Sequence, residues 1–224
     1  MDSKVKNIGR VLFIGNSATY VHDIPQTLQT LAHKAGYSLT ADSIARGGYE
    51  LVQHANAESE HGAAVYAKIA EGYDIVILQD NGNAISTSEK SKASLDACQK
   101  LAAAAREAGS RVYIYVRQPY GRVAFGKDVI EQSAAFDGLF VGIAEKIGAG
   151  CVFVNRAFAY AMKKSDARLW GPDNGHTSEV GAYLAVCTFF ASLFGTSAGV
   201  LEDGGIDPAT AKQMRDIADK ITFG

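Results

Sequence analysis

Cysteine is scarce in this chain, and the three that are present suit neither a disulfide framework nor a zinc site. Cys98, Cys151 and Cys187 are odd in number, far apart and without C-x-x-C spacing. Cys98 and Cys187 fall within helical apolar patterns, and Cys151 opens a strand-like run. We therefore expect three buried structural thiols and no metal site.

Long apolar runs and an excess of charge of one sign are also missing. No stretch approaches the roughly 18–20 apolar residues that cross a bilayer. The 22 basic residues are scattered and are balanced by 24 acidic ones, for a formal net charge of -2. This balance gives no electrostatic case for nucleic acid or for an anionic membrane. We expect neither as a partner, and the oligomeric state stays open.

Nucleotide-binding glycine motifs and a targeting signal are absent as well. Neither G-x-G-x-x-G nor a P-loop pattern occurs. Residues 1–6 carry positive charge but lead into a strand without a small-residue cleavage site. As written, the chain fits a cytoplasmic protein, whereas a signal peptide removed beforehand would place it in the periplasm or outside the cell. The compartment therefore stays unknown.

What the chain does contain is a regular alternation of strand-like and helix-like segments. Apolar, often β-branched runs predict strands over 10–15, 38–45, 74–78, 111–116 and 151–154. Helical periodicity predicts helices over 25–35, 49–71 (in two pieces meeting near Gly62), 88–108, 128–147, 156–164, 178–194 and 208–221. This order predicts a three-layer α/β/α domain spanning residues 1–224, with a five-stranded, mostly parallel sheet.

A serine follows the first predicted strand, in Gly15-Asn16-Ser17. Ligands of open α/β sheets bind at the carboxyl ends of the strands, which is where this turn would lie. Ser17 is either a turn and capping residue or a nucleophile. A nucleophile needs a base, an acid that orients the base, and donors for an oxyanion.

Candidates for these partners occur after other strands and in a late loop. Asp173 and His176 are three residues apart, so that the carboxylate can orient the imidazole; the alternative is an Asp-Asn-Gly turn with an exposed histidine. Gly48 and Asn81 each follow a predicted strand and would suit an oxyanion hole. Their alternatives are a Gly-Gly strand end and an Asn-Gly turn.

In chain order, Gly15-Asn16-Ser17, Gly48, Asn81 and Asp173-x-x-His176 resemble the SGNH hydrolases, also called the GDSL-like esterase/lipase family. The resemblance covers nearly the whole chain and implies a flavodoxin-like fold without a cofactor. It implies that Ser17 is the nucleophile, His176 the base and Asp173 the residue that orients it. It also implies an oxyanion hole made of the Ser17 backbone N–H, Gly48 and Asn81.

The chain departs from the family pattern in three places. Asn16 stands where many members have aspartate, and Thr177 stands where many have proline. The third block reads L-Q-D-N-G where the common pattern is Gly-x-Asn-Asp, so that Gln79 or Asn83 competes with Asn81 for the asparagine position. Together with the Gly-Gly-Tyr block, Gln79 resembles an uncharacterised bacterial branch of the family.

Several other residues are candidates for a substrate pocket or for the surface. The long 117–127 loop at the functional edge is typical of a binding loop. Trp170 either packs under the catalytic loop or forms a wall for a sugar ring, and His54 is interpreted as a surface residue. The pocket candidates are Gln79, Arg117, Tyr120, Arg122, Phe125 and Trp170.

The sequence thus predicts a serine esterase that hydrolyses a small acyl ester, an acetyl group on a carbohydrate being favoured by the polar and aromatic pocket candidates. The alternatives are a thioesterase or lysophospholipase with the same machinery, and a non-catalytic flavodoxin-like binding module.

Overall fold

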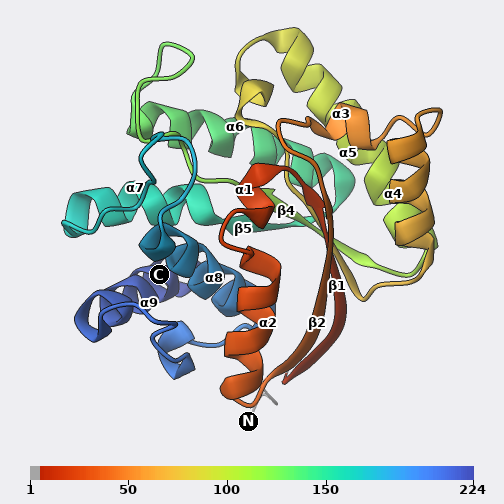
Figure 1. Ribbon diagram of the computed structural model, residues 1–224. Helices are drawn as coiled ribbons and strands as arrows, with labels where there is room; N and C mark the ends of the chain where they lie inside the picture. Colours follow the sequence, from red (N-terminus) through yellow and green to blue (C-terminus); the bar gives the residue numbers. More distant parts are fainter. Residues whose placement is uncertain (1–5) are drawn as a thin grey trace.

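The computed structural model describes residues 6–224 and is built around one five-stranded sheet (Figure 1). All four neighbouring strand pairs are parallel, in the order β2-β1-β3-β4-β5. Residues 1–5 of the positively charged N-terminal stretch lie outside the described residues. The strands are β1 Asn7–Gly15, β2 Ser38–Ala45, β3 Ile75–Leu78, β4 Arg111–Val116 and β5 Gly150–Phe153.

Successive residues of β1 point to opposite faces of the sheet, which gives the molecule two apolar cores. Val11 and Phe13 pack into one core, Leu12 and Ile14 into the other. The first core is covered by α2 Ile24–Lys34, α7 Val154–Lys164, α8 Glu179–Phe194 and α9 Pro208–Phe223. The second is covered by α3 Leu51–His54, α4 Glu60–Ala70, α5 Ser88–Glu107 and α6 Val129–Ile147. The predicted α/β/α layering with a parallel sheet is confirmed.

The predicted helix over 49–71 is indeed two helices, but the break is not at Gly62. The side chain of Ser59 accepts a hydrogen bond from the Gly62 N–H and so begins α4. Gly62 lies inside that helix, where a Cβ would stand 1.9 Å from the carbonyl oxygen of Asn56. The glycine therefore allows the preceding loop to pack closely on the first turn of α4, and the break falls between α3 and Ser59.

The thiols are buried at two of the three positions. Cys98 in α5 and Cys187 in α8 are fully buried, whereas Cys151 on the edge strand β5 is only partly covered. Among the described residues, no helix combines the length and the apolar character needed to cross a membrane.

The carboxyl ends of the strands meet at one edge of the sheet. The segments that follow β1, β2 and β3 contain Ser17, Gly48 and Asn81, respectively. Short elements occur here, namely α1 Ser17–Tyr20 after β1 and the 3-10 helix η1 Gly82–Ile85 after β3; a second 3-10 helix, η2 Ala198–Val200, precedes α9. The parallel arrangement thus brings the predicted site segments together.

Candidate active site

Ser17 begins α1 directly after β1, and its position is fixed by its neighbour Asn16. The Asn16 side-chain oxygen accepts a hydrogen bond from the Ala18 N–H at 3.1 Å, which caps the helix. Its Nδ2 donates to the Tyr49 carbonyl at 2.8 Å. Asparagine therefore keeps the capping acceptor that an aspartate would offer and adds a donor that binds the loop after β2.

Ser17, His176 and Asp173 form a continuous chain of hydrogen-bonding groups. Ser17 Oγ lies 2.9 Å from His176 Nε2, and His176 Nδ1 lies 2.5 Å from Asp173 Oδ2. The backbone N–H groups of Gly175 and His176 also donate to Asp173 Oδ1, at 3.0 and 3.1 Å. These two backbone donors and the imidazole hold the pKa of the Asp173 carboxyl well below its usual range. Asp173 is therefore a carboxylate that can hold the imidazole in one tautomer.

The loop that carries Asp173 and His176 is attached to the loop after β4. The Trp170 indole donates to the Pro119 carbonyl at 2.8 Å, and the Gly121 N–H donates to the Asn174 carbonyl at 2.9 Å. A Cβ on Gly121 would lie 2.7 Å from the Trp170 ring, so the two loops are in close contact. Trp170 packs between them, as one of its two interpretations predicts.

Three residues of the cavity that Ser17 lines have hydrogen-bond donors available. Within residues 6–224, the backbone N–H groups of Ser17 and Gly48 have no acceptor. Asn81 Nδ2 uses one of its hydrogens on the Gly48 carbonyl, at 3.2 Å, and has a second to offer. Gly48 has a φ of +74°, a conformation suited to glycine. All three residues line one cavity of about 370 Å³ together with His176.

Gln79 does not lie in this cavity, and its proposal as a pocket residue is wrong. The side chain is 1% exposed, and its oxygen accepts from the Asn16 N–H at 2.9 Å and from Thr19 Oγ1 at 3.0 Å. Its Nε2 donates to the Asp80 carbonyl. The amide therefore holds the serine turn and is buried away from any substrate. Its partners Asn16 and Thr19 lie some sixty positions earlier in the chain, so the local sequence pattern does not reveal these contacts.

Of the remaining pocket candidates, Tyr120, Arg117 and Arg122 line the cavity, whereas Trp170 and Phe125 do not. Trp170 lines a neighbouring, more apolar hollow of about 640 Å³, which His176 and Asp173 also line. Asn83 lies outside the cavity and donates its backbone N–H to Asn81 Oδ1.

The buried Asp80 holds the segments that carry the other donors. Its Oδ1 accepts from the backbone N–H groups of Leu51 and Asn81, both at 2.7 Å. Burial raises the pKa of this carboxyl. One side chain thus links the start of α3 to Asn81 in the loop after β3, a role that the sequence does not indicate.

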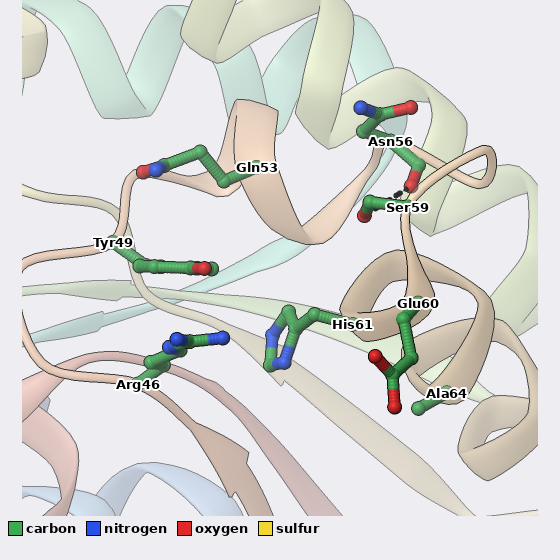
Figure 2. A pocket seen from close by; sticks show the side chains of 8 residues that line it. All are labelled: Arg46, Tyr49, Gln53, Asn56, Ser59, Glu60, His61 and Ala64. Atoms are coloured by element: carbon green, nitrogen blue, oxygen red, sulfur yellow. Dashed lines mark hydrogen bonds between the residues drawn. The ribbon is translucent and has the colours of Figure 1, made fainter.

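A third hollow, of about 600 Å³, is lined by Arg46 and Tyr49 and by residues of α4 and the loop before it, such as Ser59 and His61 (Figure 2). The Arg46 guanidinium stacks on the Tyr49 ring, with 4.8 Å from Cζ to the ring centroid, and the His61 ring meets the same ring edge-on at 5.1 Å. His54 lies next to His61, with its Nδ1 3.0 Å from His61 Nε2. His54 is fully buried, so its interpretation as a surface residue is wrong. Its spacing from Leu51, three residues earlier on one helix face, is the signal that indicates a core position.

We expect the burial of His54 to make the fold less stable in acid. Burial, and secondarily His61, lowers the pKa of His54 to about 4 from 6.5. The folded state favours neutral His54, whereas the unfolded chain binds a proton there below about pH 6.5. The free energy of unfolding therefore has its full value above pH 6.5 as far as His54 is concerned, and it falls by about 3 kcal/mol as the pH drops toward 4. Urea unfolding at pH 7.5 and 4.5 measures this, and in His54→Asn the loss should be about 2–3 kcal/mol smaller than in the wild type.

The exposed His33 on α2 provides the matched control, since His33→Asn should keep the wild-type pH dependence. An equal loss of stability in the wild type and in His54→Asn would show that His54 does not carry the effect.

Comparison with known proteins finds the likeness in structure and not in sequence profiles. No protein-family model matches the chain, and no curated protein matches it. A candidate SGNH hydrolase from Slackia heliotrinireducens is 27% identical with a TM-score of 0.69, over 80% of this chain and 96% of that chain. A DUF4886 family protein from Bacteroides uniformis is 19% identical with a TM-score of 0.79, over 96% and 94%.

An acetylxylan esterase from Geobacillus stearothermophilus is 17% identical with a TM-score of 0.64, over 88% of this chain and 98% of that chain. The resemblance noted in the sequence is therefore confirmed at the level of structure: the protein has the SGNH hydrolase fold and is similar to hydrolases of ester bonds.

Proposed function

We propose that the protein is a serine esterase that removes a small acyl group, an acetyl group above all, from a carbohydrate. The observation that carries the proposal is the chain Ser17–His176–Asp173 at the wall of a cavity that also holds three available donors. A serine within hydrogen-bond reach of an imidazole that a carboxylate orients is the arrangement of nucleophilic acyl transfer.

In the proposed reaction, Ser17 Oγ attacks the ester carbonyl carbon while His176 Nε2 takes the hydroxyl proton. The oxyanion accepts hydrogen bonds from the backbone N–H groups of Ser17 and Gly48 and from Asn81 Nδ2. The carbon–oxygen bond to the alcohol breaks, and His176 returns the proton to the departing oxygen. Water, deprotonated by His176, then attacks the acyl carbon; the bond to Ser17 Oγ breaks, His176 returns the proton to Ser17 Oγ, and the acid leaves.

The size and lining of the cavity support a small polar substrate. A space of about 370 Å³ lies near the lower end of the range for small-molecule sites. Its lining by Asn81, Arg117, Tyr120 and Arg122 offers hydrogen-bond donors and an aromatic ring to a sugar, and one structural neighbour is an acetylxylan esterase.

One observation favours the second candidate, a thioesterase or lysophospholipase. The hollow of about 640 Å³ that His176 also lines has apolar walls, formed by Val21, Trp170, Pro172 and Val180. Apolar walls next to the imidazole would suit a longer acyl chain. Comparing p-nitrophenyl acetate with p-nitrophenyl octanoate separates the two candidates, and we expect kcat/KM to be higher for the acetate.

The proposal is tested by covalent labelling. We expect the wild-type protein to hydrolyse p-nitrophenyl acetate and to react once with a fluorophosphonate, which peptide mass spectrometry should locate on Ser17, because only an activated serine attacks this probe. Heat-unfolded protein is the control and should not react. A folded protein that neither turns over the ester nor takes the label would point to the non-catalytic binding module instead.

A further inference from the structure

The cavity beside Ser17 is lined by two arginines that no carboxylate of the described residues neutralises. Arg117 and Arg122 both line it, and no Asp or Glu oxygen in residues 6–224 lies within 4.0 Å of either guanidinium. Asp173, the carboxylate that lines the same cavity, is engaged by His176 and two backbone N–H groups. The positive charge of these two side chains is thus left without a carboxylate partner among the described residues.

Arg117 makes this arrangement unusual because its side chain is almost entirely removed from solvent. The residue is 4% exposed, and its Nε donates to the Gln118 carbonyl at 2.9 Å. Its Nη2 donates to the Gly175 carbonyl at 3.4 Å, which supports the loop between Asp173 and His176. Nη1 has no acceptor among residues 6–224. Burying a cation without an anion is costly, so an anion from outside the chain is the natural counterpart.

Arg122 and Tyr120 extend the same surface. The Arg117 and Arg122 guanidinium carbons lie 4.4 and 5.4 Å from the centroid of the Tyr120 ring. The Arg122 side chain donates to no acceptor within the described part of the chain, so its fork is free to bind. Two forks beside one aromatic ring suit a planar anion next to the ring of a sugar, and a carboxylate matches the spacing of guanidinium donors.

We propose that the ester substrate carries a carboxylate on its alcohol part, as in an acetylated uronic acid, and that Arg122 with Arg117 binds that carboxylate. This inference rests on the proposed esterase function. Both arginines share with Ser17 a cavity of about 370 Å³, so the anion and the acetyl group belong to one sugar unit.

A matched pair of substrates tests the preference. Methyl glucuronoside and methyl glucoside, each acetylated at the same hydroxyl, differ in one carboxylate. We expect kcat/KM of the wild type to be about 10–100-fold higher for the uronic acid, the size of a charge-assisted hydrogen-bonded pair. In Arg122→Gln, which keeps amide donors without the charge, the ratio of the two kcat/KM values should fall toward one. A wild-type ratio near one, or an unchanged ratio in Arg122→Gln, would overturn the inference.

A binding measurement separates this inference from the esterase proposal. Calorimetry on the Ser17→Ala protein measures binding independently of catalysis. Glucuronate should bind at least about tenfold more tightly than glucose, and its affinity should fall as salt is added. Equal affinities would overturn the inference whatever the catalytic result. Binding of glucuronate by a protein that hydrolyses no ester would instead retain the anion site and reject the esterase.

Discussion

Ser17→Ala is expected to lower kcat for p-nitrophenyl acetate by about 10⁴-fold or more. The Ser17 hydroxyl is the one atom that forms the acyl bond in the proposed reaction, and loss of a triad nucleophile leaves only the residual catalysis of the oxyanion hole. The side chain of Ser17 contacts His176 Nε2, and the capping of α1 depends on Asn16 instead. The variant should therefore fold like the wild type, with an unchanged melting temperature.

Steady-state kinetics on the purified variant measures this effect, and Ser43→Ala, at an exposed position of β2, is the matched control and should retain wild-type activity. Retention of more than about 1% of the wild-type kcat by a folded Ser17→Ala protein would be incompatible with an acyl-enzyme at Ser17.

Asn81→Ala is expected to lower kcat by about 10²–10³-fold with a much smaller change in KM, because an oxyanion donor acts on charge that develops in the transition state. The loss should lie in the upper part of this range, since Asn81 Nδ2 also holds the Gly48 carbonyl at 3.2 Å. The melting temperature must be measured alongside, because the Asn81 side chain caps η1 through the Asn83 N–H.

Two neighbouring substitutions, Asn83→Ala and Gln79→Ala, are the controls for the assignment of Asn81 as the third oxyanion donor. Asn83→Ala removes a side chain outside the cavity and should leave kcat near the wild-type value. Gln79→Ala should destabilise the protein, because it leaves the buried Asn16 N–H and Thr19 hydroxyl unpaired. A near-wild-type kcat in Asn81→Ala would show that Asn81 is not an oxyanion donor, whereas loss of activity in a folded Gln79→Ala protein would reflect displacement of the serine turn that Gln79 holds.

The architecture was predictable because the signals for it are local. Continuous apolar runs such as Ile75–Leu78 are typical of strands covered on both faces, and the alternating order then fixes a parallel sheet. Asp173 and His176 could be proposed as a pair because one turn holds both, and the carboxyl ends of the strands brought Ser17, Gly48 and Asn81 to the same edge.

The roles of Gln79, Asp80 and His54 could not be read in the same way. Each depends on partners that only the tertiary structure supplies: the Asn16 N–H for Gln79, the Leu51 N–H for Asp80, and the His61 ring for His54. A polar residue at the end of a strand predicts a site, but whether its donors face the cavity or the protein interior is decided by the segments that pack around it.

The hydrogen bond from Asn16 to the Tyr49 carbonyl has a consequence for redesign of this protein. Replacing Asn16 by the aspartate that is common in the family would set a carboxylate oxygen against a carbonyl oxygen, in a position that is 2% exposed. Asn16 serves two segments at once, the turn after β1 and the loop after β2. A substitution to the residue common in the family would keep the cap of α1 but would lose the hydrogen bond to the second loop. We therefore expect Asn16→Asp to lower the stability of this protein, although it brings the sequence closer to the family pattern.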